Sequence, residues 1–134
     1  PPAPWEWICK IKDVVKIPIV ANGDIDSLES LRKCQEITGC DRFMIGRASL
    51  KNPFIFSQLR AGLSTPATWE TQRALILDFY FASCNSVNEY FATARTKQFL
   101  RNLTLTSPEA YNVFQQTKAI LKPQEFINHL QQLL

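Results

Sequence analysis

The sequence lacks any hydrophobic run long enough to cross a membrane. A membrane-spanning helix needs roughly 20 consecutive apolar residues, and Lys, Asp, Asn or Gln interrupts every apolar stretch of these 134 residues. The chain also begins Pro1-Pro2-Ala3-Pro4, without an initiator methionine, a basic leader or an apolar leader segment. We therefore expect a soluble protein with no signal peptide, and we interpret its start as lying inside a longer protein.

Paired cysteines and clustered histidines are also missing. The four cysteines (Cys9, Cys34, Cys40 and Cys84) match neither a Cys-x-x-Cys pair nor the spacing of a zinc finger, and His129 is the only histidine. We therefore expect no metal site. Without a secretory signal, the simplest interpretation is free, buried thiols in a reducing cytoplasm.

A large charge of one sign is missing as well, since the net charge is +3. Residues 1–60 carry nine basic and seven acidic side chains, residues 61–91 carry one and three, and residues 92–134 carry five and two. The basic excess of the last segment permits a polyanionic partner, although a net charge of this size is ordinary for a soluble domain.

The first sixty residues have the hydrophobic pattern of strands alternating with helices. The predicted elements are a helix over residues 5–15, a strand over 17–21, a helix from a capping box at Asp26 and Glu29 to Gly39, a strand over 42–45 and a short helix after Pro53. The run over residues 17–21 is wholly apolar, which is typical of a parallel strand covered on both faces. A strand, a helix and a strand in about thirty residues predict a βαβ unit.

The remaining residues show helical patterns only. Residues 62–68 resemble a linker because Gly, Ser, Thr and Pro gather there. Four helices are then predicted: one containing Leu75, Ile76, Phe79, Tyr80, Val87 and Tyr90, one over about 92–105, one opened by Ser107-Pro108-Glu109, and one opened by Pro123. We expect a small antiparallel bundle. Aromatic residues at helical spacing favour the core over base stacking, which applies to Tyr80, Tyr90, Phe91 and Phe99.

Two turns at the ends of the predicted strands are candidates for anion binding. Asn22-Gly23-Asp24 follows the first strand, and Gly46-Arg47 follows the second. Glycine leaves room for a phosphate to approach backbone N–H groups, and Arg47 adds a charged fork. Judged from this pattern alone, ordinary strand-to-helix turns with a surface arginine explain the residues equally well.

The sequence around these turns resembles a known family. Residues 17–25 (Ile-Pro-Ile-Val-Ala-Asn-Gly-Asp-Ile) and 38–47 (Thr-Gly-Cys-Asp-Arg-Phe-Met-Ile-Gly-Arg) are similar to two signature segments of the tRNA-dihydrouridine synthases, at a fitting separation. Asn52-Pro53 continues the match, and Ala48 stands where the family often has glycine. In that family the two turns bind the phosphate and ribityl end of FMN. The resemblance implies cofactor-binding roles for Asn22, Gly23, Asp24, Gly46 and Arg47.

The family also implies a fold class and domain limits. Residues 1–61 would be the C-terminal βαβ portion of an FMN-binding TIM (β/α)8 barrel, and residues 62–68 would be a linker. Residues 69–134 would be an all-α helical domain that binds tRNA.

A second resemblance concerns the helical part. Residues 94–100 (Ala-Arg-Thr-Lys-Gln-Phe-Leu) and 114–116 (Phe-Gln-Gln) are similar to the C-type branch, with Phe99 in place of the usual tryptophan. Enzymes of that branch reduce uridine 16 in the tRNA D-loop. The resemblance implies tRNA contacts at Arg95, Lys97 and Lys118, and Arg101 lies four residues after Lys97 on the same stripe. The alternative is a solvated helix face.

The family chemistry requires residues that this sequence does not contain. Hydride passes from FMN to uracil, NADPH recharges the flavin, and a cysteine on an earlier barrel loop supplies a proton. None of the four cysteines lies in that motif, so we expect no catalytic residue here and no activity from the chain alone. The full-length protein is expected to be a monomer.

Two other function classes stay open. One is an FMN-dependent or phosphate-binding barrel oxidoreductase that acts on a small metabolite, against which the basic helix after residue 92 argues. The other is a non-enzymatic RNA-binding helical module, against which the two phosphate-site turns argue.

Overall fold

The chain divides into two compact units. The computed structural model describes residues 3–65 and 67–134, and the units are Pro1–Thr65, called here the strand unit, and Pro66–Leu134, called the helical unit. Pro1 and Pro2 of the expected internal start, and Pro66 of the predicted linker, lie outside the described residues.

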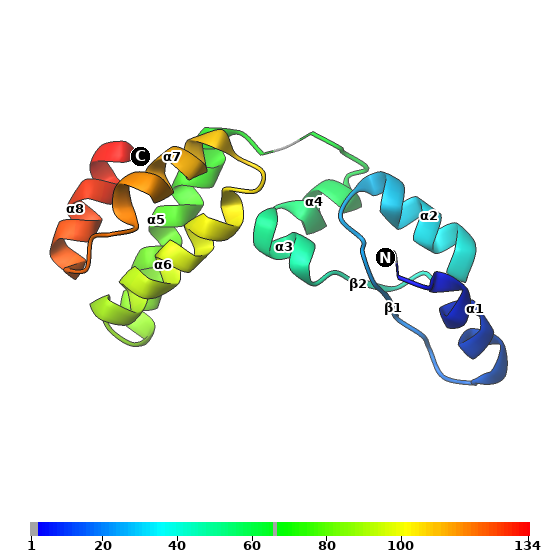
Figure 1. The fold of residues 1–134 in the computed structure, drawn as a ribbon. Coiled ribbons are helices and arrows are strands. Elements are labelled where there is room, and N and C mark those ends of the chain that lie inside the picture. Colours follow the sequence, from blue (N-terminus) through cyan, green and yellow to red (C-terminus); the bar gives the residue numbers. More distant parts are fainter. Residues whose placement is uncertain (1–2, 66) are drawn as a thin grey trace. The chain divides into compact units, whose positions relative to one another are not determined.

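The strand unit contains the predicted strand, helix and strand. Its elements are α1 (Trp5–Val14), β1 (Ala21–Asn22), α2 (Leu28–Thr38), β2 (Phe43–Met44), α3 (Arg47–Lys51) and α4 (Ile55–Arg60). The two strands are parallel, with Ala21 opposite Phe43 and Asn22 opposite Met44, and α1 packs against α2 (Figure 1). The predicted βαβ order is therefore confirmed.

The first strand is shorter and less covered than the sequence predicts. Only Ala21 of the apolar run and the Asn22 that follows it are paired, while the Ile17 side chain is 69% exposed and Val20 is exposed too. The expectation of a strand covered on both faces is wrong for these two residues, because a parallel strand is covered only when further strands and helices flank it.

The N-cap of α2 lies one residue after the predicted N-cap. Ser27 is the N-cap: its hydroxyl accepts from the Ser30 backbone N–H, and the Ser30 hydroxyl accepts from the Ser27 N–H. The predicted Asp26–Glu29 capping box is thus wrong by one position, because two adjacent oxygen-bearing residues compete for the cap. Gly39 ends the helix in the left-handed region, as predicted.

The core of the strand unit is small. Its buried members are Trp5, Ala21, Ile25, Cys34 and Cys40. All four cysteines are free, with Cys34 and Cys40 buried and the other two half-buried. Burial raises the pKa of the Cys34 thiol, which keeps it protonated and unreactive.

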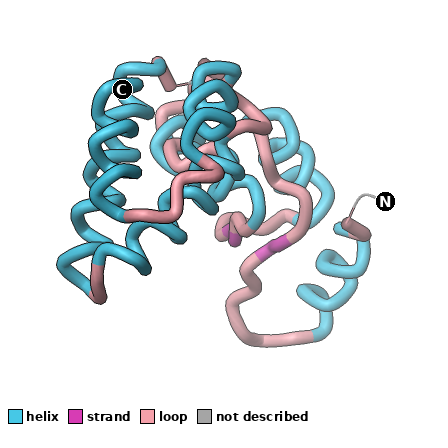
Figure 2. Tube along the Cα trace, turned by 60° about the vertical axis from the view of Figure 1, so that its left-hand side comes forward, coloured by secondary structure: helices cyan, strands magenta, loops and turns pink. Residues whose placement is uncertain are grey.

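The helical unit consists of four helices around one core, and helices make up most of the whole chain (Figure 2). They are α5 (Trp69–Ser86), α6 (Glu89–Leu103), α7 (Pro108–Thr117) and α8 (Pro123–Leu133). Three start at hydroxyl or amide caps, on Thr68, Asn88 and Ser107, each accepting from a backbone N–H three residues on. The predicted starts of α7 and α8 are confirmed.

The boundary between α5 and α6 differs from the prediction. The sequence pattern placed Val87 and Tyr90 on the apolar face of the first helix, but α5 ends at Ser86 and Asn88 caps a new helix. Both side chains are exposed. Asn88 overrides the apolar periodicity because its side chain accepts from the Phe91 N–H and so satisfies a donor at the new helix start.

No helix within the described part of the chain combines the length and apolar character that a membrane crossing requires.

Candidate functional site

The two candidate turns meet at one edge of the strand unit. Because β1 and β2 are parallel and in register, the residues that follow them emerge on the same side. The Arg47 Nη2 atom lies 2.8 Å from the Asp24 Oδ1 atom, although the two residues are 23 positions apart. The Arg47 side chain is 85% exposed, so this ion pair adds little stability. In this structure the pair places the guanidinium beside the Asp24 carboxylate, close to where both strands end.

The Asn22-Gly23-Asp24 turn is held in an unusual backbone conformation. Gly23 has φ +120° and Asp24 has φ +48°, a region that residues other than glycine rarely adopt. The Ala3 N–H donates to Asp24 Oδ2 at 3.0 Å, and the Trp5 indole N–H donates to the Gly23 carbonyl at 2.9 Å. Ala3 and the first residue of α1 therefore fix the turn.

The two glycines serve different purposes. A Cβ atom built on Gly23 would lie 2.3 Å from the Ala3 Cβ atom, so packing against Ala3 requires glycine there. A Cβ atom on Gly46 would meet nothing within 4 Å. The space beside Gly46, next to Arg47, is therefore open, while the side of Gly23 that a Cβ would occupy is filled by protein.

Three of the four predicted RNA-binding cations are exposed in the helical unit. Arg95 and Arg101 lie on α6, and Lys118 follows α7. The Arg95 Nη1 atom donates to Gln98 Oε1 at 2.6 Å, and the Lys118 ammonium donates to Gln115 Oε1. These contacts join neighbours on the surface and leave the charges open to solvent.

Lys97 is placed differently. Its side chain is half-buried, its ammonium donates to the Ile120 carbonyl in the connection between α7 and α8, and it lies 5.5 Å from the centre of the Phe126 ring. Burial lowers the pKa of this ammonium. Lys97 therefore links α6 to the segment between α7 and α8, whereas Arg95 and Arg101 are exposed.

Two further exposed residues were missed as surface candidates. Tyr90 is 73% exposed and Phe91 is 41% exposed, against the expectation that both belong to the core; Tyr80 is buried and Phe99 half-buried, as predicted. The sequence signal that locates them is the cap at Asn88, which starts a new helix and places Tyr90 and Phe91 in its first turn.

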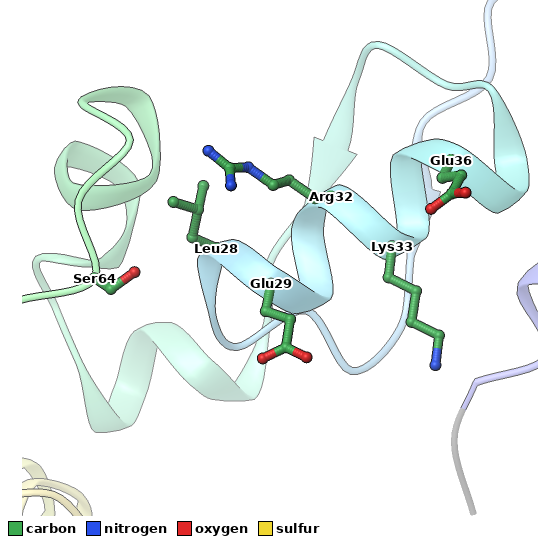
Figure 3. Close-up of a pocket in the computed structure, with 6 residues that line it drawn as sticks. All are labelled: Leu28, Glu29, Arg32, Lys33, Glu36 and Ser64. Carbon is green, nitrogen blue, oxygen red and sulfur yellow. The ribbon is translucent and has the colours of Figure 1, made fainter.

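A hollow elsewhere in the strand unit offers no comparable chemistry. It is an open depression along α2, lined by Leu28, Glu29, Arg32, Lys33, Glu36 and Ser64 (Figure 3). Its charged residues are of both signs and come mainly from one exposed helix face. Within residues 3–65 and 67–134, no group of three or more His, Cys, Asp or Glu side chains is arranged to hold a metal ion.

These features describe an α/β unit with an arginine held at the ends of parallel strands, followed by a helical unit with exposed cations. A family model described as dihydrouridine synthase (Dus) matches residues 1–132. The chain therefore belongs to the dihydrouridine synthase family, as its two signature segments predict.

Individual relatives agree with this assignment. The chain is 36% identical over 122 residues to a tRNA-dihydrouridine(16) synthase of Aquipseudomonas alcaligenes, an alignment that covers 88% of this chain and 39% of the relative. It is 39% identical over 118 residues to one of Pseudomonas syringae pv. tomato, covering 85% and 37%. For one of Shewanella oneidensis the identity is 30% over 132 residues, covering 98% and 42%. The chain thus spans about two fifths of the length of these curated relatives.

Proposed function

We propose that the chain is part of a flavin-dependent tRNA-dihydrouridine synthase. The whole protein would reduce uridine in the tRNA D-loop, at position 16, to 5,6-dihydrouridine, with NADPH as reductant, in the cytoplasm. One observation carries this proposal: the chain aligns over 85% or more of its length with each of three tRNA-dihydrouridine(16) synthases. The chain contributes a binding site for the flavin phosphate and helices for tRNA.

In this proposal residues 1–61 are the last portion of a TIM barrel, residues 62–68 are a linker, and residues 69–134 are a helical tRNA-binding domain. The parallel β1–β2 pair with α2 between the strands supports this reading. The exposed Ile17 and Val20 side chains support it as well, because adjacent barrel strands and helices would cover them.

The strand-end residues fit the phosphate and ribityl end of FMN. A guanidinium has five N–H donors, so the single contact from Arg47 Nη2 to Asp24 leaves donors for a phosphate. The open side of Gly46 lets that phosphate approach the backbone. Asn22 is exposed at the same edge and has an amide that can bond ribityl hydroxyls. Gly23 shapes the turn and Asp24 orients Arg47. FMN, when bound, supplies the hydride.

On the helical unit, Arg95, Arg101 and Lys118 would contact tRNA phosphates, since all three are exposed. Lys97 would act mainly by holding the α7–α8 connection, since its ammonium already bonds the Ile120 carbonyl. Each phosphate contact that is removed should lower the salt dependence of tRNA binding by up to about one counterion.

The decisive experiment maps dihydrouridine in tRNA from cells that lack the parent gene. Loss at position 16 alone is expected, and restoration should follow from the wild-type full-length gene. Loss at another position would retain the enzyme class and change the branch. An unchanged map would contradict the proposal and favour a flavoenzyme acting on a small metabolite.

Two variants of the full-length protein then separate the two sites. Arg47→Ala should lose flavin and keep tRNA affinity, whereas Arg95→Ala should keep flavin and folding and weaken tRNA binding. Wild-type tRNA affinity of Arg95→Ala at low salt would refute the assignment of that arginine.

A further inference from the structure

One side of α6 carries aromatic and basic side chains together. Its exposed residues, called here the α6 face, are Tyr90, Phe91, Ala94, Arg95, Gln98 and Arg101. The opposite side of the helix faces the core through Ala92, Thr93, Thr96, Leu100 and Leu103. The α6 face contains no acidic residue, and Glu89, the exposed first residue of α6, lies outside this arc.

The members of the α6 face are neighbours on the helix. Phe91 and Arg95 are four residues apart, and Gln98 and Arg101 are three apart, spacings that place side chains side by side. The bond from Arg95 Nη1 to Gln98 Oε1, 2.6 Å long, links the two pairs. A ring, a guanidinium, an amide and a second guanidinium thus follow one another along the helix.

No described carboxylate forms an ion pair with the arginines of this face. The ion pair found in the described parts of the chain joins Asp24 and Arg47, which belong to the strand unit. Neither Arg95 nor Arg101 lies within 4.0 Å of a described carboxylate, so both guanidinium groups can bind an anion from outside.

The two aromatic rings of this face take part in no ring pair with another described residue. The ring pairs among the described residues involve Phe79, Phe99, Tyr80, Phe81 and Phe126. Tyr90 and Phe91 take part in none of them and are exposed. Two exposed rings beside two open cations match the chemistry of an unpaired nucleic-acid strand, whose bases stack on aromatic rings while its phosphates meet arginines.

We propose that Tyr90 and Phe91 form a stacking platform for unpaired bases of an RNA loop, while Arg95 and Arg101 bind the phosphates of the same strand. This inference rests on the proposed function and adds to it the form of RNA that α6 recognises. A duplex would gain only the phosphate contacts, because its stacked bases are not available to the rings.

The test measures binding of the full chain to three RNAs: a tRNA, a short oligouridylate that forms no base pairs, and an RNA duplex of the same length. The variants are Tyr90→Leu and Phe91→Leu, which keep an apolar side chain and remove the ring. Tyr111→Leu is the matched control, because Tyr111 is an exposed aromatic residue on α7. Circular dichroism checks that all variants keep their helices.

Each ring variant should weaken oligouridylate and tRNA binding about tenfold, the usual effect of losing one stacked base. Duplex affinity and the salt dependence should stay at the wild-type values, since no charge is removed. Arg95→Ala should instead weaken all three RNAs and lower the salt dependence by up to about one counterion. Tyr111→Leu should bind like the wild type.

Different failures overturn different claims. If the ring variants bind oligouridylate and tRNA like the wild type while Arg95→Ala does not, the platform is wrong and the proposed tRNA-binding role stands. A face that packs against protein would give this result, because leucine retains the apolar surface. If the wild-type chain binds no tRNA even at low salt, both the platform and the tRNA-binding role of the helical unit are overturned.

Discussion

Among the described residues, ten hydrophobic side chains are buried in the core of the helical unit, whereas five are buried in the core of the strand unit. The four helices cover one another's apolar faces with residues close in sequence. The strand unit leaves Ile17 and Val20 exposed just before β1 and Met44 exposed on β2. Burial of apolar surface is the main favourable term in folding, so we infer that stability is concentrated in the helical unit.

The comparison also separates two kinds of site. In the strand unit, Arg47 reaches its place through an ion pair and through a turn held by Ala3 and Trp5, all distant in sequence. On the α6 face, neighbours along one helix produce the arrangement. A strand-end site therefore depends on tertiary contacts that a helical face does not need.

The strongest test of this comparison is Phe126→Ala. The Phe126 side chain is fully buried and its ring centre lies 5.9 Å from that of Tyr80. Removing it should lower the free energy of unfolding of the helical unit by about 3–5 kcal/mol. Urea unfolding followed by circular dichroism measures the loss, and Tyr111→Ala, at an exposed ring, should cost far less. If hydrogen exchange accelerates equally in both units, the two do not unfold independently.

Alkaline pH should destabilise the helical unit through Tyr80. Burial, with Cys84 nearby, raises the pKa of Tyr80 to about 12 in the folded chain, against about 10 when unfolded. Between these values the unfolded chain loses the proton first, so stability is complete below pH 10 and falls towards pH 12. The loss is on the order of 1–3 kcal/mol.

Tyr80→Phe should flatten this alkaline decline, and Tyr90→Phe, at an exposed ring, should leave it in place. Urea midpoints at pH 9, 10 and 11 measure the difference between the variants. A decline as steep in Tyr80→Phe as in the wild type would show that the phenol is not the group responsible.

In the strand unit, Gly23→Ala and Gly46→Ala should behave differently. At Gly23 a Cβ meets Ala3 at 2.3 Å and the backbone has φ +120°, which should cost about 1–3 kcal/mol. At Gly46 no atom lies within 4 Å of the position that a Cβ would take, so the cost should be smaller than at Gly23. Hydrogen exchange of β1 and β2 amides reports both. Equal protection in the two variants would disprove the tight packing of the turn.

The smallest expected effect concerns Lys97. Lys97→Met keeps the aliphatic stem near Phe126 and removes the bond to the Ile120 carbonyl, which should lower stability by about 1 kcal/mol. Arg101→Met, at an exposed position on the same helix, should change stability by less than about 0.5 kcal/mol. Thermal unfolding compares the two. A stable Lys97→Met variant that binds tRNA poorly would reassign Lys97 from packing to RNA contact.

Several features were predictable because they depend on local chemistry. Ser107-Pro108 marks the start of α7 and Gly39 the end of α2, since caps use side chains and backbone angles within one turn. Two of the wrong predictions share one cause, competition between local signals: Ser27 replaces Asp26 as cap, and Asn88 overrides the apolar spacing of Val87 and Tyr90. The exposure of Ile17 and Val20 has another cause, since it depends on which strands and helices lie beside them.

The sequence by itself determined the family, the βαβ order and the four later helices, because signature segments, caps and periodicity are properties of short stretches. Only the tertiary structure decided that Arg47 pairs with Asp24, that Gly23 packs on Ala3, and that Lys97 turns inward while Arg95 stays open. The three contacts, which are Arg47 with Asp24, Gly23 with Ala3 and Lys97 with Ile120, each join residues about twenty positions apart. Their pairing depends on how strands and helices pack, which no local pattern encodes.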